Sequence, residues 1–203
     1  GIIAWEGGEP LLRFDDLLYL IKQTHQESEA IIATTGSGLT DEKAKQLKEA
    51  GLDAAIISLD HYSPDKHNTF RGNKRAFDNV VNGIRLFREN GILPAVCICA
   101  TKDMMQEAGG LYRYLDVVKN IGAAFIQVLD ATPSGNYIGQ NVLLSKKELT
   151  EIKKFHVNVN TNPEFKDYPA VSARALLEDE DNYGCMAGNG LIYVDSSVNI
   201  QAC

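Results

Sequence analysis

The sequence is short of the features that mark membrane-spanning, disulfide-stabilised and nucleic-acid-binding proteins. No apolar run approaches the roughly 20 residues that a membrane-spanning helix needs. Only four cysteines occur in 203 residues, and their irregular spacing does not make a disulfide framework. The formal net charge of −7 argues against a general nucleic-acid or anionic-membrane surface. We therefore expect a protein of the reducing cytoplasm, with neither nucleic acid nor a membrane as its partner.

Repeats and metal-ligand spacings are missing as well. No internal repeat or low-complexity segment is visible, and the four histidines have no metal-type spacing. We interpret His61 and His67 as solvated loop residues. The first four residues lack the basic n-region of a secretory signal. What remains is a chain with 44% hydrophobic residues, which fits one globular domain with a small extension.

The chain alternates short apolar segments with amphipathic ones. Five apolar segments, rich in Ile and Val, have the pattern of parallel strands buried on both faces. They are Ile2–Trp5, Ala30–Thr35, Ala54–Leu59, Leu93–Ala100 and Ala123–Leu129. Helices are expected between and after them, at about Asp15–Gln26, Thr40–Gly51, Lys74–Glu89, Leu111–Asn120 and Ser145–His156.

Five strand–helix units predict a parallel α/β architecture with right-handed crossovers. By themselves the units fit a partial barrel, a doubly wound sheet or part of an eight-stranded barrel. The polar, proline-containing segment Asn158–Pro169 predicts a linker into a C-terminal extension. In all of these folds ligands bind at the carboxyl ends of the strands, so the residues that follow each strand are the candidate site.

The turn after the first strand has the composition of a ligand-binding turn. Trp5–Pro10 ends an apolar stretch and opens a helical one, with Gly7 and Gly8 followed by Glu9 and Pro10. Two residues without side chains let the backbone approach a ligand closely. Glu9 is an acceptor at the turn, able to bind an ammonium group. A loop that only reverses the chain is the alternative interpretation.

Two further motifs follow along the chain. The third strand ends in Ser58-Leu59-Asp60, and a His-containing segment after it ends in Arg71-Gly72. Much later, Cys185-Met186-Ala187-Gly188 precedes an alternating segment that ends at Cys203. The residues between these cysteines predict a hairpin centred on Asp195–Ser197.

In their sequence and their order, these stretches resemble the radical S-adenosylmethionine (radical SAM) superfamily with an auxiliary-cluster extension of the SPASM or Twitch type. The resemblance implies S-adenosylmethionine and a 4Fe–4S cluster as cofactors, and a reductant such as flavodoxin or ferredoxin. It implies an enzyme that cleaves S-adenosylmethionine to a 5′-deoxyadenosyl radical, which abstracts hydrogen from a substrate. Relatives with such extensions commonly act on peptides or proteins, so a peptide is the expected substrate class.

The resemblance also implies roles for residues of this chain. Gly7–Pro10 would hold the methionine amino group of the cofactor, and Thr35, at the end of the neighbouring strand, would also belong to the cofactor site. Ser58 would bind the carboxylate or the ribose, and Asp60 a hydroxyl. Arg71 would form a charge-assisted bond with the carboxylate. Turn or cap roles for Ser58 and Asp60, and a surface salt bridge for Arg71, are the alternatives.

The C-terminal cysteines are expected to serve a second cluster. By the resemblance, Cys185 and Cys203 would be ligands of an auxiliary 4Fe–4S cluster. Unligated thiols on a structural hairpin and a zinc site are the alternatives. The family usually has glycine where Val198 stands, so a different turn is expected here.

One departure from the family pattern concerns the radical-generating cluster. The family's Cys-x-x-x-Cys-x-x-Cys loop does not occur in this sequence. We therefore expect an internal fragment of a longer protein. Residues 1–157 would form a partial (β/α)6 barrel whose first strand and cluster ligands lie upstream, and residues 158–203 would begin the extension.

Two rival functions are also compatible with the sequence. Gly36-Ser37-Gly38 follows a strand and opens a helix like a dinucleotide fingerprint, but Asp41 stands where the third glycine belongs. Another parallel α/β nucleotide-binding enzyme is thus one alternative, and a non-catalytic binding module is the other. Cys97 and Cys99 point to the same face of a strand, and buried, unligated thiols are the simplest interpretation.

We predict that the 203-residue chain alone does not cleave S-adenosylmethionine, even after anaerobic iron–sulfide reconstitution, because it has no Cys-x-x-x-Cys-x-x-Cys loop. Chromatographic detection of 5′-deoxyadenosine against a no-protein blank is the measurement. The full-length protein, reconstituted in parallel, is the control. Product above the blank from the 203-residue chain would contradict the prediction.

Overall fold

Six parallel strands lie side by side in the order in which they occur in the chain. The structure is a computed structural model that describes residues 1–177 and 187–202. The strands of the large sheet are β1 (Ile2–Trp5), β2 (Glu29–Thr34), β3 (Leu52–Ser58), β4 (Leu93–Ala100), β5 (Phe125–Asp130) and β6 (Ala170–Ala173). Sequential order has no reversal point, so the doubly wound alternative is excluded. The sheet is open, because β1 and β6 each pair on one side only.

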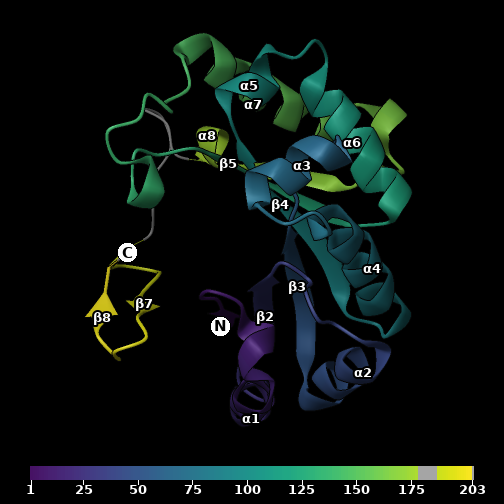
Figure 1. Cartoon of the computed structure of the whole chain (residues 1–203), viewed down its shortest axis with the longest axis vertical. Coiled ribbons are helices and arrows are strands. Elements are labelled where there is room, and N and C mark those ends of the chain that lie inside the picture. The colour runs from purple at the N-terminus through teal and green to yellow at the C-terminus, as the bar shows by residue number, and fades with distance from the viewer. Residues whose placement is uncertain (178–186, 203) are drawn as a thin grey trace.

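Helices connect the strands and lie along the outer side of the sheet (Figure 1). They are α1 (Phe14–Thr24), α2 (Asp41–Ala50), α3 (Pro64–Arg71), α4 (Ala76–Glu89), α5 (Lys102–Gln106), α6 (Gly110–Ile121), α7 (Lys146–Thr161) and α8 (Arg174–Leu177). Short 3-10 turns occur at η1 (Pro10–Arg13), η2 (Gly135–Tyr137) and η3 (Pro163–Phe165). None of the helices in the described ranges has the length and apolar character needed to cross a membrane.

Local capping signals place both ends of α2 and the start of α7 where the sequence predicts them. The Thr40 side chain accepts a hydrogen bond from the Lys43 amide at the start of α2, and Gly51 ends that helix with φ +105°. Ser145 and Glu148 form a reciprocal capping box at the start of α7. In contrast, α3 was not predicted, because its sequence is polar and only one of its residues, His67, is buried.

The two faces of the sheet differ in burial. Side chains toward the helices are fully covered, as at Ile57 and Val96. On the inner face Ser58, Cys97 and Gln127 are only half-buried. The prediction of burial on both faces is therefore wrong for the inner face, because the open sheet carries its helices on the outside. This leaves an inner face that a ligand can reach.

The prediction that Asn158–Pro169 is a linker is wrong. Helix α7 continues through its first residues, η3 follows, and β6 then pairs with β5 as a sixth strand. The side chain of Asn160 makes the two hydrogen bonds that a neighbouring strand would make to β6. Its amide nitrogen donates to the Val171 carbonyl at 2.7 Å, and its oxygen accepts from the Val171 amide at 3.0 Å. The core thus extends past the predicted boundary at residue 157 and includes β6.

The predicted C-terminal hairpin is confirmed in the described residues. Strand β7 (Tyr193–Val194) pairs antiparallel with β8 (Ile200–Gln201). The Asp195 carboxylate accepts hydrogen bonds from the amides of Ser197 and Asn199 and from the side chains of Asn199 and Gln201. These bonds lower the pKa of Asp195, the Asn199 side chain first. One carboxylate therefore organises the whole turn.

Val198 adopts the backbone conformation of a glycine. Its φ is +64°, and it is the one non-glycine residue with positive φ in the described ranges. This is the left-handed conformation that favours glycine, adopted here by a β-branched residue. That the turn differs from the family's stays a prediction. For a β-branched residue this conformation costs roughly 1–2 kcal/mol.

We predict that Val198→Gly stabilises the hairpin against local opening by roughly 1–2 kcal/mol, which slows amide exchange at Val198 and Asn199 about 5- to 30-fold. Hydrogen exchange followed by NMR measures this. Ser197→Gly is the matched control, because Ser197 has no positive φ and gains nothing from glycine. Equal protection in the Val198→Gly variant and the wild type would show that the turn is unstrained.

Candidate functional site

The turn after β1 presents bare backbone to open space. A Cβ atom built on Gly7 or Gly8 would meet no atom within 4 Å, and Gly7 has φ +140°. Among the described residues, no hydrogen-bond donor reaches the carbonyl oxygen of either glycine. Pro10 opens η1 directly afterwards, which suits its fixed φ. The turn thus offers unpaired acceptors to a ligand, while its proline begins the next element.

The carboxylate of Glu9 points into the protein. Its Oε1 accepts hydrogen bonds from the Leu11 amide at 3.1 Å and the Thr34 hydroxyl at 2.6 Å. Its Oε2 accepts from the Thr35 amide at 2.8 Å and the Thr35 hydroxyl at 2.5 Å. These four donors use the acceptor sites of a carboxylate. Both oxygens of Glu9 are therefore engaged within the protein, and Glu9 with Thr35 ties the end of β1 to the end of β2. That this side chain binds an ammonium group stays a prediction.

Asp60, which follows β3, is a buried carboxylate at this edge. It accepts hydrogen bonds from Arg71 Nε at 2.5 Å and from the Cys99 amide at 3.2 Å. The Asp60 side chain is 2% exposed, whereas that of Arg71 is 32% exposed. Among the described residues no hydrogen-bond acceptor meets the two terminal nitrogens of Arg71, and the Phe70 ring centre lies 5.7 Å from its Cζ. This ion pair therefore leaves the terminal donors of Arg71, a partly exposed side chain, available to a ligand.

The two histidines near this edge are buried, so their interpretation as solvated residues is wrong. His67 is 1% exposed, and its Nδ1 accepts the Asp60 amide at 3.1 Å. Burial lowers the pKa of His67, against the opposing charge of Asp60. His61 is 7% exposed. Both rings serve as internal hydrogen-bond partners.

The inner face below these loops carries two neutral thiols. Ser58 pairs in register with Cys97, and Cys97 and Cys99 share the half-buried face, as predicted. Burial, and after it the charge of Asp60, raises the pKa of Cys97 to about 12. The charges of Arg71 and Glu6 also act on this thiol. The ends of β1, β3 and β4 therefore converge around one inner surface.

The glycines after β2 serve packing. Gly36 has φ +74°, and a Cβ there would lie 2.8 Å from the Asn79 carbonyl oxygen of α4. The Gly36 and Ser37 amides donate to the hydroxyls of Thr34 and Thr35 at 3.0 and 3.3 Å. Amides that already have partners cannot cradle a phosphate. The dinucleotide alternative at this turn has no support.

The predicted auxiliary-cluster ligands, Cys185 and Cys203, lie outside the described residues. Within residues 1–177 and 187–202, no group of three or more His, Cys, Asp or Glu side chains is arranged to hold a metal ion.

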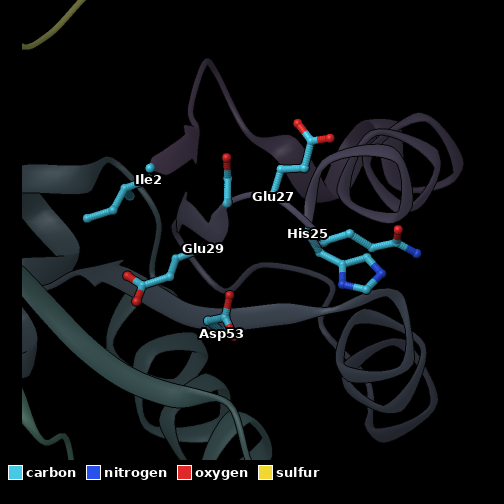
Figure 2. Close-up of a pocket in the computed structure, with 8 residues that line it drawn as sticks. Ile2, His25, Glu27, Glu29 and Asp53 are labelled. Carbon is cyan, nitrogen blue, oxygen red and sulfur yellow. The ribbon is translucent and has the colours of Figure 1, made fainter.

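A pocket of about 550 Å³ opens at the opposite, amino ends of the strands. Figure 2 shows Glu27, Glu29 and Asp53 around it, with the ring of His25 beside them. Asp53 is engaged there, since its carboxylate accepts the Ala30 amide at 2.9 Å. In barrels of parallel strands this end contributes stability and the carboxyl end holds the chemistry, so we place the functional site at the carboxyl end.

One part of the site could not be found by sequence reasoning. Glu107, at the end of α5, contacts His61, Tyr62 and Lys66 near the end of β3. Fully buried Tyr114 of α6 donates to the Leu59 carbonyl at 2.7 Å. No motif or spacing in the sequence signals these contacts.

A family model and the sequence relatives were compared with the chain. The model of the Radical SAM superfamily matches residues 1–105. AdoMet-dependent heme synthase of Oleidesulfovibrio alaskensis is 23% identical over 224 residues, which cover 100% of this chain and 56% of that protein. Probable GTP 3′,8-cyclase of Methanococcus aeolicus is 29% identical over 206 residues, which cover 99% of this chain and 62% of that protein.

The fold has close counterparts among solved structures. Streptococcus suis SuiB superposes with a TM-score of 0.76 over 98% of this chain and 49% of SuiB, at 16% sequence identity. At this identity the likeness concerns the fold, which is that of a partial parallel barrel. The chain spans between about half and three-fifths of the length of these three proteins.

We predict that Cys97 resists alkylation in the native protein. With its pKa at about 12, roughly one thiol in ten thousand is ionised at pH 8, and the thiolate is the nucleophile. Peptide-resolved mass spectrometry after iodoacetamide treatment should show at least about 100-fold slower labelling than in guanidinium. Equal rates in both states would contradict the burial of this thiol.

Proposed function

Because the chain belongs to the radical SAM superfamily, we propose that it binds S-adenosylmethionine at the carboxyl ends of β1 to β4. We further propose that the whole protein cleaves this cofactor reductively and abstracts a hydrogen atom from a substrate. The single observation that carries the proposal is the open backbone of Gly7 and Gly8, located at the strand end where ligands of parallel barrels bind.

The polar groups at these strand ends match the methionine end of the cofactor in charge and hydrogen-bonding type. The free carbonyl oxygens of Gly7 and Gly8 suit an ammonium group, which is a donor only. The terminal nitrogens of Arg71 suit a carboxylate, and Asp60 holds the guanidinium from behind. Ser58 faces the inner surface between them and is proposed to meet the carboxylate or the ribose. Glu9, Pro10 and Thr35 complete the proposed cofactor site: Glu9 and Thr35 join the ends of β1 and β2 by hydrogen bonds, and Pro10 opens η1.

The described residues do not fit an iron–sulfur cluster, because they contain no group of three or more His, Cys, Asp or Glu side chains arranged to hold a metal ion. When bound and reduced in the whole protein, the cofactors would supply the 5′-deoxyadenosyl radical. This chain would orient S-adenosylmethionine and keep its inner face apart from bulk water. A reductant such as flavodoxin or ferredoxin, and a reducing cytoplasm, belong to the same proposal.

A peptide or protein is the proposed substrate class. The support is fold-level: SuiB bound to its precursor peptide SuiA superposes with a TM-score of 0.73 over 98% of this chain. The C-terminal hairpin, proposed to begin an auxiliary-cluster extension with Cys185 and Cys203, adds to it. A small-molecule substrate is the second candidate, favoured by the heme synthase and the GTP cyclase among the sequence relatives.

We predict that Gly8→Val in the full-length protein weakens binding of S-adenosylmethionine at least about tenfold while the fold is kept. The valine side chain would fill the space through which the ligand approaches. It meets no protein atom there, and Gly8 has no positive φ, so little loss of stability is expected.

Isothermal titration calorimetry measures the affinity, and the unfolding midpoint is the control. Gly8→Ala provides a graded comparison with a smaller intrusion. Unchanged affinity in a folded Gly8→Val variant would assign the turn to chain reversal alone and remove the main support for the proposed function.

A further inference from the structure

The loop that carries Asp60 is held by the carboxylate of a residue far away in the sequence. Glu107 ends α5, 46 residues after His61. Its Oε1 accepts a hydrogen bond from His61 Nε2 at 3.0 Å, and it also accepts from Lys66 Nζ. Its Oε2 accepts from the Tyr62 hydroxyl. Three donors from one short stretch of chain thus converge on a single side chain.

The direction of the His61 bond follows from its second nitrogen. His61 Nδ1 accepts the Ser63 amide at 2.8 Å, so the proton lies on Nε2 and points at Glu107. His61 is 7% exposed, and an amide in place of the carboxylate would offer a single acceptor oxygen to the three donors His61, Tyr62 and Lys66. An orphaned buried donor is costly, and the loop would shift to reach another acceptor or water.

Glu107 is suited to act as a permanent acceptor. The hydrogen bond from Lys66, ahead of that from Tyr62, lowers the pKa of Glu107 to about 2. The carboxylate therefore stays ionised throughout the physiological range. Tyr62 is further held by Arg113 of α6, whose guanidinium lies 3.3 Å from the phenol oxygen.

Helix α6, which carries Arg113, also holds Leu59, the residue before Asp60. Tyr114 of α6 donates to the Leu59 carbonyl at 2.7 Å, in a fully buried position. The chain from Leu59 to Lys66 is thus fixed on one side by α5 and α6. Asp60 lies within this stretch, and Asp60 in turn orients Arg71.

The geometry points to Glu107 as a positioning residue for the cofactor carboxylate: it fixes the loop of Asp60 and thereby the guanidinium of Arg71, without touching the ligand itself. This inference rests on the proposed function, since it presumes that Arg71 meets the carboxylate of S-adenosylmethionine. Its distinguishing consequence is that Glu107 matters for a ligand that has the carboxylate and not for one that lacks it.

The test uses the full-length protein and two probes, S-adenosylmethionine and decarboxylated S-adenosylmethionine, with dissociation constants measured by calorimetry. Glu107→Gln should weaken S-adenosylmethionine roughly tenfold and leave the decarboxylated analogue unchanged. Tyr62→Phe, which removes one donor only, should have a smaller effect in the same direction. Glu89→Gln is the matched control, because Glu89 is half-exposed in a helical ion pair with Arg85 and should change neither constant.

Each outcome has a separate meaning. Equal weakening of both probes by Glu107→Gln would show general loosening of the fold and overturn the positioning role. Unchanged affinity for both probes in a folded Glu107→Gln variant would overturn it too, while wild-type binding would still support the proposed function. Failure of the wild-type protein to bind S-adenosylmethionine would overturn the proposed function, and the positioning role with it.

Discussion

A nearly fully buried carboxylate, that of Asp60, determines how the carboxyl edge of the sheet is built. A buried charge is costly unless it is paired and hydrogen-bonded. Arg71 supplies the opposite charge and the Cys99 amide a further donor. The backbone of Asp60 is held by His67, which burial keeps neutral. Satisfying this one group therefore brings α3 and the end of β4 to the end of β3.

Glu9 has an equivalent function one strand pair away. Its four hydrogen bonds join the turn after β1 to the end of β2. Both carboxylates are thus bonded within the protein, whereas the carbonyls of Gly7 and Gly8 and the terminal nitrogens of Arg71 have no hydrogen-bond partner among the described residues. Acidic residues that a motif suggests as ligands can act as the scaffold that presents other groups, as second-layer residues commonly do.

The inner face of the open sheet sets the conditions for chemistry. Helices bury the outer face along β2 to β4, as at Ile32, Ile57 and Val96, while Ser58, Cys97 and Cys99 remain half-buried on the inner one. Burial keeps the thiols protonated, with the pKa of Cys97 at about 12. Neutral thiols are poor metal ligands and react slowly with alkylating agents, because the thiolate is the reactive form. Such a surface is partly shielded from water without being filled by its own side chains.

The sequence by itself determined the strand–helix alternation, the turn at Gly7–Pro10, and the hairpin around Asp195. All three depend on signals within a few residues: apolar runs, paired glycines, and an Asp that bonds its own turn. Strand β6 was not predicted, because it has only four residues and its free edge bonds to the side chain of Asn160. No local sequence pattern indicates such a contact.

Only the tertiary structure decided what the polar groups of the site do. Glu9 faces Thr34 and Thr35, 25 and 26 residues away, and Glu107 reaches His61 across 46 residues. Whether a carboxylate meets a ligand or another part of the chain depends on which strand ends the fold brings together. Residue type and spacing specify the chemistry a side chain offers, but its partner is set by packing between elements far apart in the chain.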